Sequence, residues 1–106
     1  MELIEKVYQL TENFPSKEQY GLTSQVRRAA TSIAMNIAEG SGSGYDDEFR
    51  RFLAIALRSN YELMCGLEIA GRLGYCAEAQ REQILSRADE LSAMITGLRK
   101  KLMSDS

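Results

Sequence analysis

The chain contains very few positions at which regular secondary structure has to break. Pro15 is its only proline, and most of its eight glycines lie in two clusters. An all-β fold needs turn residues every few positions, because each strand is short. The long unbroken segments therefore predict an all-α protein. The length of 106 residues suits a single domain that covers residues 1–106.

Within these segments, apolar residues recur at spacings of three and four, as expected for amphipathic helices. The predicted helices cover about residues 2–12, 23–40, 45–73 and 77–103. We expect Thr23 to cap the second helix, residues 40–44 to form a turn, and Gly74 to end the third helix. Short connections force neighbouring helices to run antiparallel, so we predict an up-down-up-down four-helix bundle.

The sequence lacks the residues on which most enzyme and metal sites depend. It contains no histidine, which excludes His-based triads and His-containing metal sites. Cys65 and Cys76 match no CxxC pattern, and we expect them to be reduced, structural thiols. The glycine-rich turn lacks the Lys-Ser/Thr pair of a P-loop and follows no strand. We therefore expect no enzyme activity, no cofactor, no metal and no small-molecule substrate.

Neither a membrane span nor a secretory signal is visible in the sequence. No apolar run approaches the roughly 18 residues that a membrane-spanning helix needs. The first residues, Met1, Glu2 and Leu3, lack the basic start of a signal peptide. We expect a cytoplasmic protein with no membrane partner.

The third predicted helix is apolar over a wider arc than the core of one bundle uses. Its charged residues share about a third of the helical wheel, and most other positions are apolar. The residues that extend beyond one core seam, and that we predict to form a subunit interface, include Phe52, Ile55, Leu57, Tyr61 and Met64. The short first helix would also leave part of the apolar groove uncovered in a monomer. Both features predict a homo-oligomer.

A polar stripe follows the second predicted helix. The stripe consists of Gln25, Arg28, Ser32, Asn36 and Glu39, together with Glu62 of the third predicted helix. One interpretation is that this stripe lines a pore or contacts an RNA backbone, because amides and arginine donate to phosphate oxygens. The alternative is a structural polar network in which Arg28 pairs with Glu39 or Glu62.

Nucleic-acid binding would have to depend on local clusters of cations, because the formal net charge is −2 and the sequence pI is near 5.2. The candidate cations are Arg27, Arg28, Arg50, Arg51, Arg58, Arg99, Lys100 and Lys101. A symmetric oligomer would repeat these sites and so strengthen their field. The alternative is a solvated surface with helical ion pairs such as Arg58 with Glu62 and Glu68 with Arg72.

A long stretch of the sequence resembles a known family. The matching residues are Phe14, Pro15, Glu18, Tyr20 to Thr23, Gln25, Arg27 to Ala29, Ser32, Ile33, Asn36 to Gly40, Phe49, Phe52, Leu53, Ile55, Ala56, Ser59, Glu62, Leu63, Leu67 and Leu73 to Tyr75. They are similar to the signature of the 23S rRNA intervening-sequence protein family, which includes the accessory variability determinant of diversity-generating retroelements. This resemblance implies a four-helix bundle that assembles as a barrel-like homopentamer with a central channel and has no known catalysis. The retroelement members associate with a reverse transcriptase and its RNA template.

The chain departs from the family pattern in three ways. Arg58 stands where the family usually has glycine before the serine. The start is shorter than in many members, which suggests a truncated N-terminus. Retroelement accessory proteins tend to be basic, whereas this chain is acidic.

Taken with the residues, the resemblance predicts a non-enzymatic homo-oligomeric scaffold that binds structured RNA or an RNA-bound reverse transcriptase. The alternative hypothesis is a structural or protein-interaction oligomer with no nucleic-acid role.

Overall fold

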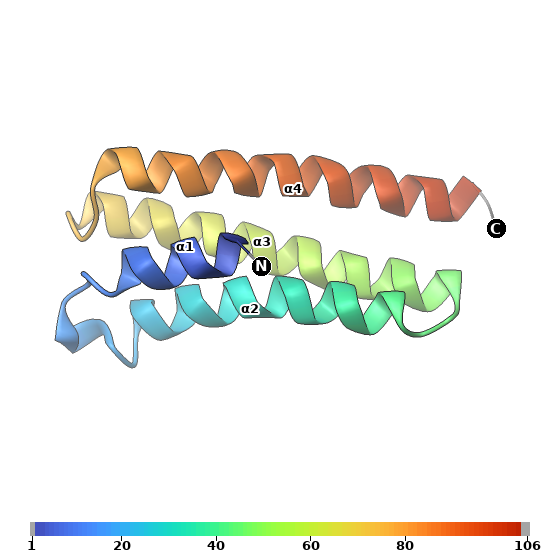
Figure 1. Ribbon diagram of the computed structural model, residues 1–106, viewed down its shortest axis with the longest axis horizontal. Coiled ribbons are helices and arrows are strands. Elements are labelled where there is room, and N and C mark those ends of the chain that lie inside the picture. The colour runs from blue at the N-terminus through green and yellow to red at the C-terminus, as the bar shows by residue number, and fades with distance from the viewer. Residues whose placement is uncertain (1, 105–106) are drawn as a thin grey trace.

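Four helices run alternately up and down along one axis in the computed structural model, which describes residues 2–104 (Figure 1). The elements are α1 (Glu2–Thr11), a 3-10 turn η1 (Ser16–Glu18), α2 (Leu22–Ser41), α3 (Asp46–Arg72) and α4 (Glu78–Ser104). The described residues contain no strand. The predicted all-α fold and the up-down-up-down four-helix bundle are therefore confirmed.

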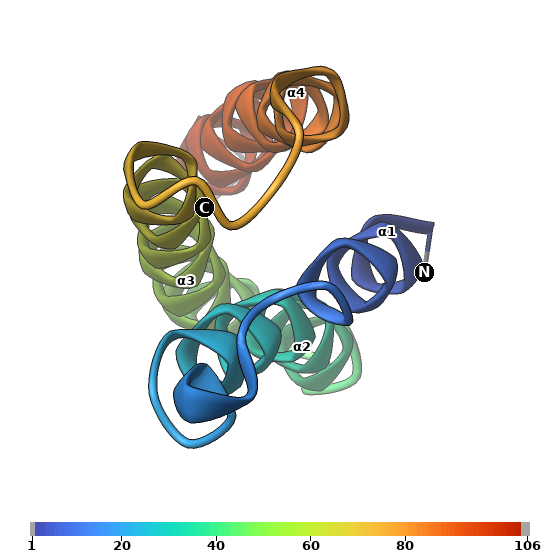
Figure 2. The same ribbon diagram turned by 90° about the vertical axis from the view of Figure 1, so that its left-hand side faces the viewer.

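The helices form a ring in which each one touches its two neighbours. Seen end-on, α1, α2, α3 and α4 follow one another around the bundle (Figure 2). Contacts join α1 with α2, α2 with α3, α3 with α4, and α4 with α1, and the described residues give no contact between the diagonal pairs. α2 and α3 share the most extensive of these contacts, so their surfaces largely define one side of the molecule.

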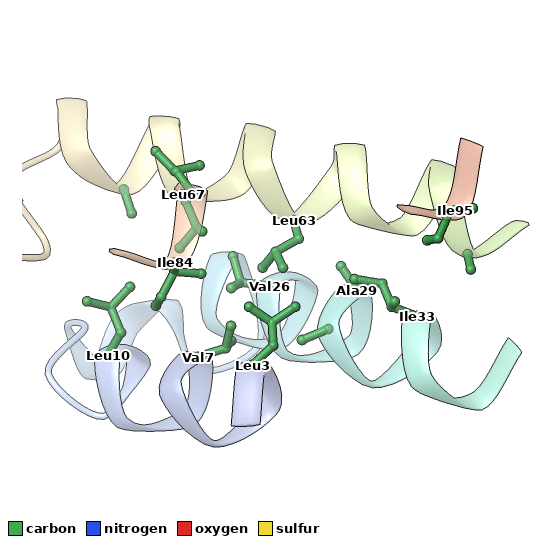
Figure 3. Packing of buried hydrophobic residues seen from close by; sticks show 14 of the residues in the cluster. Leu3, Val7, Leu10, Val26, Ala29, Ile33, Leu63, Leu67, Ile84 and Ile95 are labelled. Carbon is green, nitrogen blue, oxygen red and sulfur yellow. The ribbon is translucent and has the colours of Figure 1, made fainter. Parts of the chain in front are cut away.

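All four helices contribute apolar side chains to one core. Figure 3 shows these side chains, which include Leu3, Val7, Leu10, Val26, Ala29, Ile33, Leu63, Leu67, Ile84 and Ile95. They recur every three or four residues along their helices, because that spacing keeps them on one helical face. The periodicity on which the sequence prediction depended is thus the periodicity of the observed core.

Gly74 ends α3 in the way that the sequence predicts. It has a φ of +74°, which glycine adopts without steric cost. The Tyr75 N–H donates to the Ala70 carbonyl at 2.9 Å, and the Gly74 N–H donates to the Gly71 carbonyl at 3.1 Å. This pair of hydrogen bonds is a Schellman motif, and it turns the chain towards α4.

The predicted bounds of α2, about residues 23–40, lie within one residue of the observed Leu22–Ser41, but its predicted cap and the start of the turn that follows are wrong. Thr23 is buried inside the helix, and the N-cap residue is Gly21. The helix then continues through Gly40 and Ser41, which the sequence placed in a turn. Only Gly44 in that turn has a positive φ, at +82°. Gly40 is needed for another reason, because an added Cβ there would lie 2.7 Å from the Phe52 Cβ.

Helix α1 is short and reaches only about half of the bundle's length (Figure 1). At its C-terminal end, Arg27 of α2 donates from Nε to the Thr11 Oγ1 at 2.8 Å. At its N-terminal end, Arg87 of α4 pairs with Glu2 at 2.8 Å. These contacts hold α1 between α2 and α4 at one half of the molecule.

Glu18 links the 3-10 turn to two other parts of the chain. Its Oε1 accepts a hydrogen bond from the Leu22 N–H at 3.2 Å, and its Oε2 accepts one from the Tyr75 hydroxyl at 2.8 Å. The hydrogen bond from Tyr75 is the larger cause, and that from Leu22 the second, of a lowered pKa of Glu18. The same contact raises the pKa of Tyr75. The Tyr75 ring also packs on Phe14, with ring centroids 5.6 Å apart.

We expect Glu18 to make the stability of the fold depend on pH. Because its pKa is lower in the folded chain than its ordinary value of 4.5, its stabilising effect is complete above that value and is lost as the pH falls through the folded pKa. The free energy of unfolding of Glu18→Gln should therefore fall less than that of the wild type below about pH 4.5. Urea denaturation from pH 3 to 7, with Glu12→Gln as the control for one lost charge, tests this. A difference between wild type and Glu18→Gln that stays constant with pH would contradict it.

No described helix is both long enough and apolar enough to cross a membrane.

Candidate nucleic-acid interface

Five of the predicted cations gather at one end of the bundle. α3 begins and α4 ends there, because the two helices run antiparallel (Figure 1). We call the following residues the basic end: Arg50 and Arg51 from α3, and Arg99, Lys100 and Lys101 from α4. Arg58 lies in the middle of α3 and is not part of it. Two clusters that are distant in the sequence thus become neighbours in space.

Acidic and basic residues are unevenly distributed along the length of the molecule. All acidic residues of α4 lie between Glu78 and Glu90, in its first half, and residues 91–104 contain no acidic residue. On α3, Glu62 and Glu68 lie towards the opposite end. The acidic residues at the basic end are Asp46, Asp47 and Glu48 in the first turn of α3, where they complement the helix dipole, and Glu39 near the C-terminal end of α2. Among the described residues, this end thus has five cations against four carboxylates, a small excess of positive charge in a chain whose net charge is negative.

Two arginines at the basic end already have carboxylate partners. Arg50 pairs with Asp47 at 2.6 Å, and Arg51 pairs with Glu48 at 3.0 Å. The hydrogen bond from Arg51 lowers the pKa of Glu48. Arg58 has no ion pair among the described residues. The ion pairs expected between Arg58 and Glu62 and between Glu68 and Arg72 are thus not formed in the described part of the chain.

The two predicted cations of α2 differ in their surroundings. Arg27 is partly buried, hydrogen bonds to Thr11, and lies 4.5 Å from the centroid of the Tyr8 ring. Its donors are therefore used within the subunit. Arg28 is exposed and forms no ion pair with Glu39 or Glu62. The predicted network in which one of these carboxylates satisfies Arg28 is therefore absent from the described residues.

The polar stripe of α2 lies along an open groove between α2 and α3. The groove has a volume of about 570 Å³ and is lined by Leu22, Gln25, Val26, Arg28, Ala29, Ser32, Ser59, Glu62, Cys65, Gly66 and Ile69. Within it, the hydroxyls of Ser32 and Ser59 lie 2.8 Å apart, and Asn36, one turn further along α2, donates to the Ser32 carbonyl at 2.8 Å. The hydrogen bond between Ser32 and Ser59 joins α2 to α3 and so fixes their register, whereas the hydrogen bond from Asn36 lies within α2. Gln25 and Glu39 remain exposed.

The predicted second apolar face of α3 consists of two separate flanks. At about 100° per residue, Phe52 and Ile55 lie on the flank towards α2, as the contact of Phe52 with Gly40 requires. Leu57, Tyr61 and Met64 lie on the flank towards α4. Leu57 and Met64 are partly buried and pack against the core of their own subunit. Tyr61 is 54% exposed and is thus the most accessible of the five residues.

Asn60 is a polar core residue that the sequence prediction missed. It is fully buried on α3, between core positions occupied by Ala56 and Leu63. Its Nδ2 donates to the Ala88 carbonyl at 2.7 Å and to the Ser92 Oγ at 2.8 Å. A polar residue within an apolar seam was the available signal, because such residues often fix helix register. These hydrogen bonds define how α4 lies against α3.

Arg81 makes a second contact that the sequence did not reveal. Its guanidinium, from α4, lies over Gly71 of α3, where any larger side chain would collide with it. Both cysteines are free: Cys65 is exposed in the α2–α3 groove, and Cys76 packs against the core.

Among residues 2–104, no three His, Cys, Asp or Glu side chains are arranged to hold a metal ion. The fold and the basic end define a small helical-bundle protein with a polarised charge distribution, and no feature of the described residues indicates catalysis.

The family model described as 23S rRNA-intervening sequence protein matches residues 1–97. The chain belongs to this family, as the sequence resemblance predicted. No curated protein matches the chain.

A solved structure with the same fold supports the architecture. It is the crystal structure of a protein of unknown function from the S23 ribosomal protein family of Bacteroides thetaiotaomicron. The TM-score is 0.75 at 23% sequence identity, and the alignment covers 92% of this chain and 98% of that chain. At this identity the similarity concerns the fold alone.

Proposed function

We propose that this protein is a non-enzymatic homo-oligomeric scaffold that binds structured RNA through its basic end. The observation that carries the proposal is the division of charge along the bundle. Cations from α3 and α4 meet at one end, and the last turns of α4 contain no acidic residue. Phosphate groups supply most of the affinity in nucleic-acid binding and are attracted by such clusters.

Self-association is part of the proposal because the chain exposes apolar side chains on more than one face. Met35, Ile69 and Leu73 are all exposed on α2 or at the C-terminal end of α3. The family resemblance implies five copies in a ring, which would bring five basic ends into one assembly and increase their combined field. In a retroelement setting, an RNA-bound reverse transcriptase would join the same complex.

The test combines particle mass with RNA binding. Light scattering should give about five times the chain mass of 11.9 kDa. Binding of a hairpin RNA across a salt series should weaken steeply with salt. The double variant Lys100→Gln/Lys101→Gln should reduce the slope of log affinity against log salt by about 0.7–0.9 for each phosphate that it no longer neutralises.

The matched control removes the same charge from the other end of the molecule. Lys17→Gln/Arg72→Gln changes two exposed cations there and should leave the slope close to that of the wild type. A wild type that binds no RNA at low salt would contradict the RNA proposal and favour a protein-interaction oligomer, for which the partly apolar α2–α3 groove offers a surface. A monomeric mass would contradict the proposed assembly.

A further inference from the structure

The outer surface of α2 carries two opposite charges with an exposed methionine between them. Arg28 and Glu39 are eleven residues apart, which is about three helical turns, so they lie on the same side of the helix. Both are exposed, and neither forms an ion pair with the described residues. Met35 lies between them and is 66% exposed. We call these three residues, together with Ser32, the α2 face.

The outer surface of α4 carries the same arrangement with the charges in the opposite order. Asp89 and Lys100 are also eleven residues apart, and both are exposed. Ala93 is exposed between them, so a small side chain takes the place that Met35 has on α2. Asp89 forms no ion pair with the described residues. We call Asp89, Ala93 and Lys100 the α4 face.

Hydrogen bonds through α3 show that the two faces lie at the same height along the bundle. The Ser32 hydroxyl of α2 lies 2.8 Å from that of Ser59 on α3, and the next residue, Asn60, donates to the Ser92 Oγ of α4 at 2.8 Å. Ser32 and Ser92 are therefore nearly level. α2 and α4 also run in the same direction, because the helices alternate up and down (Figure 1).

From this level, the charges of the two faces match one by one. Arg28 and Asp89 lie four and three residues before it, and Glu39 and Lys100 lie seven and eight residues after it. Each residue advances a helix by about 1.5 Å. Every charge on the α2 face therefore has the opposite charge at its own height on the α4 face, to within about one residue.

The uncharged middle parts of the two faces also match. Met35 is long and apolar, whereas Ala93 is small and lies within about two residues of the same height, roughly 3 Å along the axis. The flank of α3 beside the α4 face adds Leu57, which is partly buried, and Tyr61, which is 54% exposed. A second copy that placed Met35 on Ala93 would therefore cover apolar surface as well as pair charges.

The two faces cannot meet within one subunit. α2 and α4 are diagonal in the bundle, and the described residues give no contact between them (Figure 2). From this complementarity we infer that α2 of one copy packs against α4 of a second copy, with their axes parallel. Arg28 then pairs with Asp89 of the second copy, and Glu39 pairs with its Lys100. The inference rests on the homo-oligomer of the proposed function and names the surfaces that join its subunits.

This contact closes a ring, because the paired residues lie at the same height and successive copies are not displaced along the axis. It uses two different faces, so each copy has two neighbours. Both faces border α3: Ser32 belongs to one and bonds to Ser59, and Ala93 of the other directly follows Ser92. α3 thus lies between the two contacts and faces the ring axis, where Arg58 of every copy lines the channel.

The first test reverses the charges of one pair. Arg28→Glu and Asp89→Arg each place like charges opposite each other in every contact, so light scattering at low salt should give a mass near the 11.9 kDa of one chain. The double variant Arg28→Glu/Asp89→Arg restores the attraction and should recover the mass of the wild type. Lys17→Glu and Glu12→Arg are the matched controls, because these exposed residues lie outside both faces, and they should not change the mass.

The second test links the two faces covalently. In a Cys65→Ser background, oxidised Met35→Cys/Ala93→Cys should give a ladder of linked chains on a denaturing gel. A disulfide needs Cα atoms within about 7 Å, which only residues of different copies satisfy here. Met35→Cys/Ala79→Cys is the control, because Ala79 lies fourteen residues before Ala93 on α4, and it should give no ladder.

Three results would overturn the inference: charge-reversed single variants with the mass of the wild type, a double variant that stays dissociated, or equal linking in both cysteine variants. With an oligomeric wild type, each of them leaves the proposed assembly standing and moves the contact to another face. A monomeric wild type overturns the assembly and the inference together. If a charge variant loses its helical circular dichroism, the cysteine variants decide alone.

Discussion

Replacing Gly40 with alanine is expected to lower the free energy of unfolding by about 1–3 kcal/mol, the usual cost of overpacking. Helix propensity alone predicts the opposite sign, because alanine is favoured over glycine by about 0.8–1.0 kcal/mol within a helix. An added Cβ at Gly40 would lie 2.7 Å from the Phe52 Cβ and 3.0 Å from the Phe49 Cδ1. The Phe52 Cβ is fixed to the backbone, so relief requires α2 and α3 to move apart.

Gly97 provides the matched control for this substitution. It lies within α4, and a Cβ there would have no neighbour within 4 Å. Gly97→Ala should therefore stabilise the fold by up to about 1 kcal/mol. Chemical denaturation of both variants at equal protein concentration tests the contrast. If both substitutions stabilised the protein equally, close packing at Gly40 would not be what requires a glycine there.

The substitution Asn60→Asp should have a still larger effect at neutral pH. It preserves the size of the side chain but replaces the Nδ2 donor with a carboxylate oxygen that faces the Ala88 carbonyl. An uncompensated charge at a fully buried position costs about 3–5 kcal/mol. Burial also raises the pKa of the introduced carboxyl. The cost is present above that pKa and is relieved as the pH falls through it, so the variant should become more stable on mild acidification.

Ser92→Ala separates the missing hydrogen bond from the buried charge. It removes one acceptor of Asn60 and should cost about 0.5–1.5 kcal/mol, with no dependence on pH. Denaturation curves at pH 5 and pH 8 distinguish the two variants. An Asn60→Asp protein as stable as the wild type at pH 8 would mean that water or a rearranged partner reaches this position.

The sequence predicted the parts of the structure that depend on local chemistry. Helix positions follow from apolar spacing, and Gly74 ends α3 because few other residues adopt its positive φ without strain. Gly40 was placed in a turn because it begins a glycine-rich run, and a glycine needed for close packing looks the same in sequence as one needed for a turn. The contact that distinguishes them comes from Phe52, twelve positions away.

The candidate site could be predicted only in part, for a similar reason. The cations were recognisable by residue type, but their meeting at one end depends on the antiparallel order of α3 and α4. Which residues of α4 face which residues of α3 depends further on the register between these helices, which Asn60 and Ser92 determine through a contact 32 positions apart. Arg27 illustrates the opposite error. Its charge indicated a surface role, but Thr11 and Tyr8 hold it against α1.

The division of charge described above also makes each subunit an electric dipole along an axis that is 47 Å long. Near any polyanion, such a dipole experiences a torque as well as an attraction. The subunit, or a ring in which the axes are aligned, therefore rotates while it is still within about a Debye length of the partner, roughly 8–10 Å. It arrives with the end of α4 first, which shortens the rotational search that otherwise slows specific association.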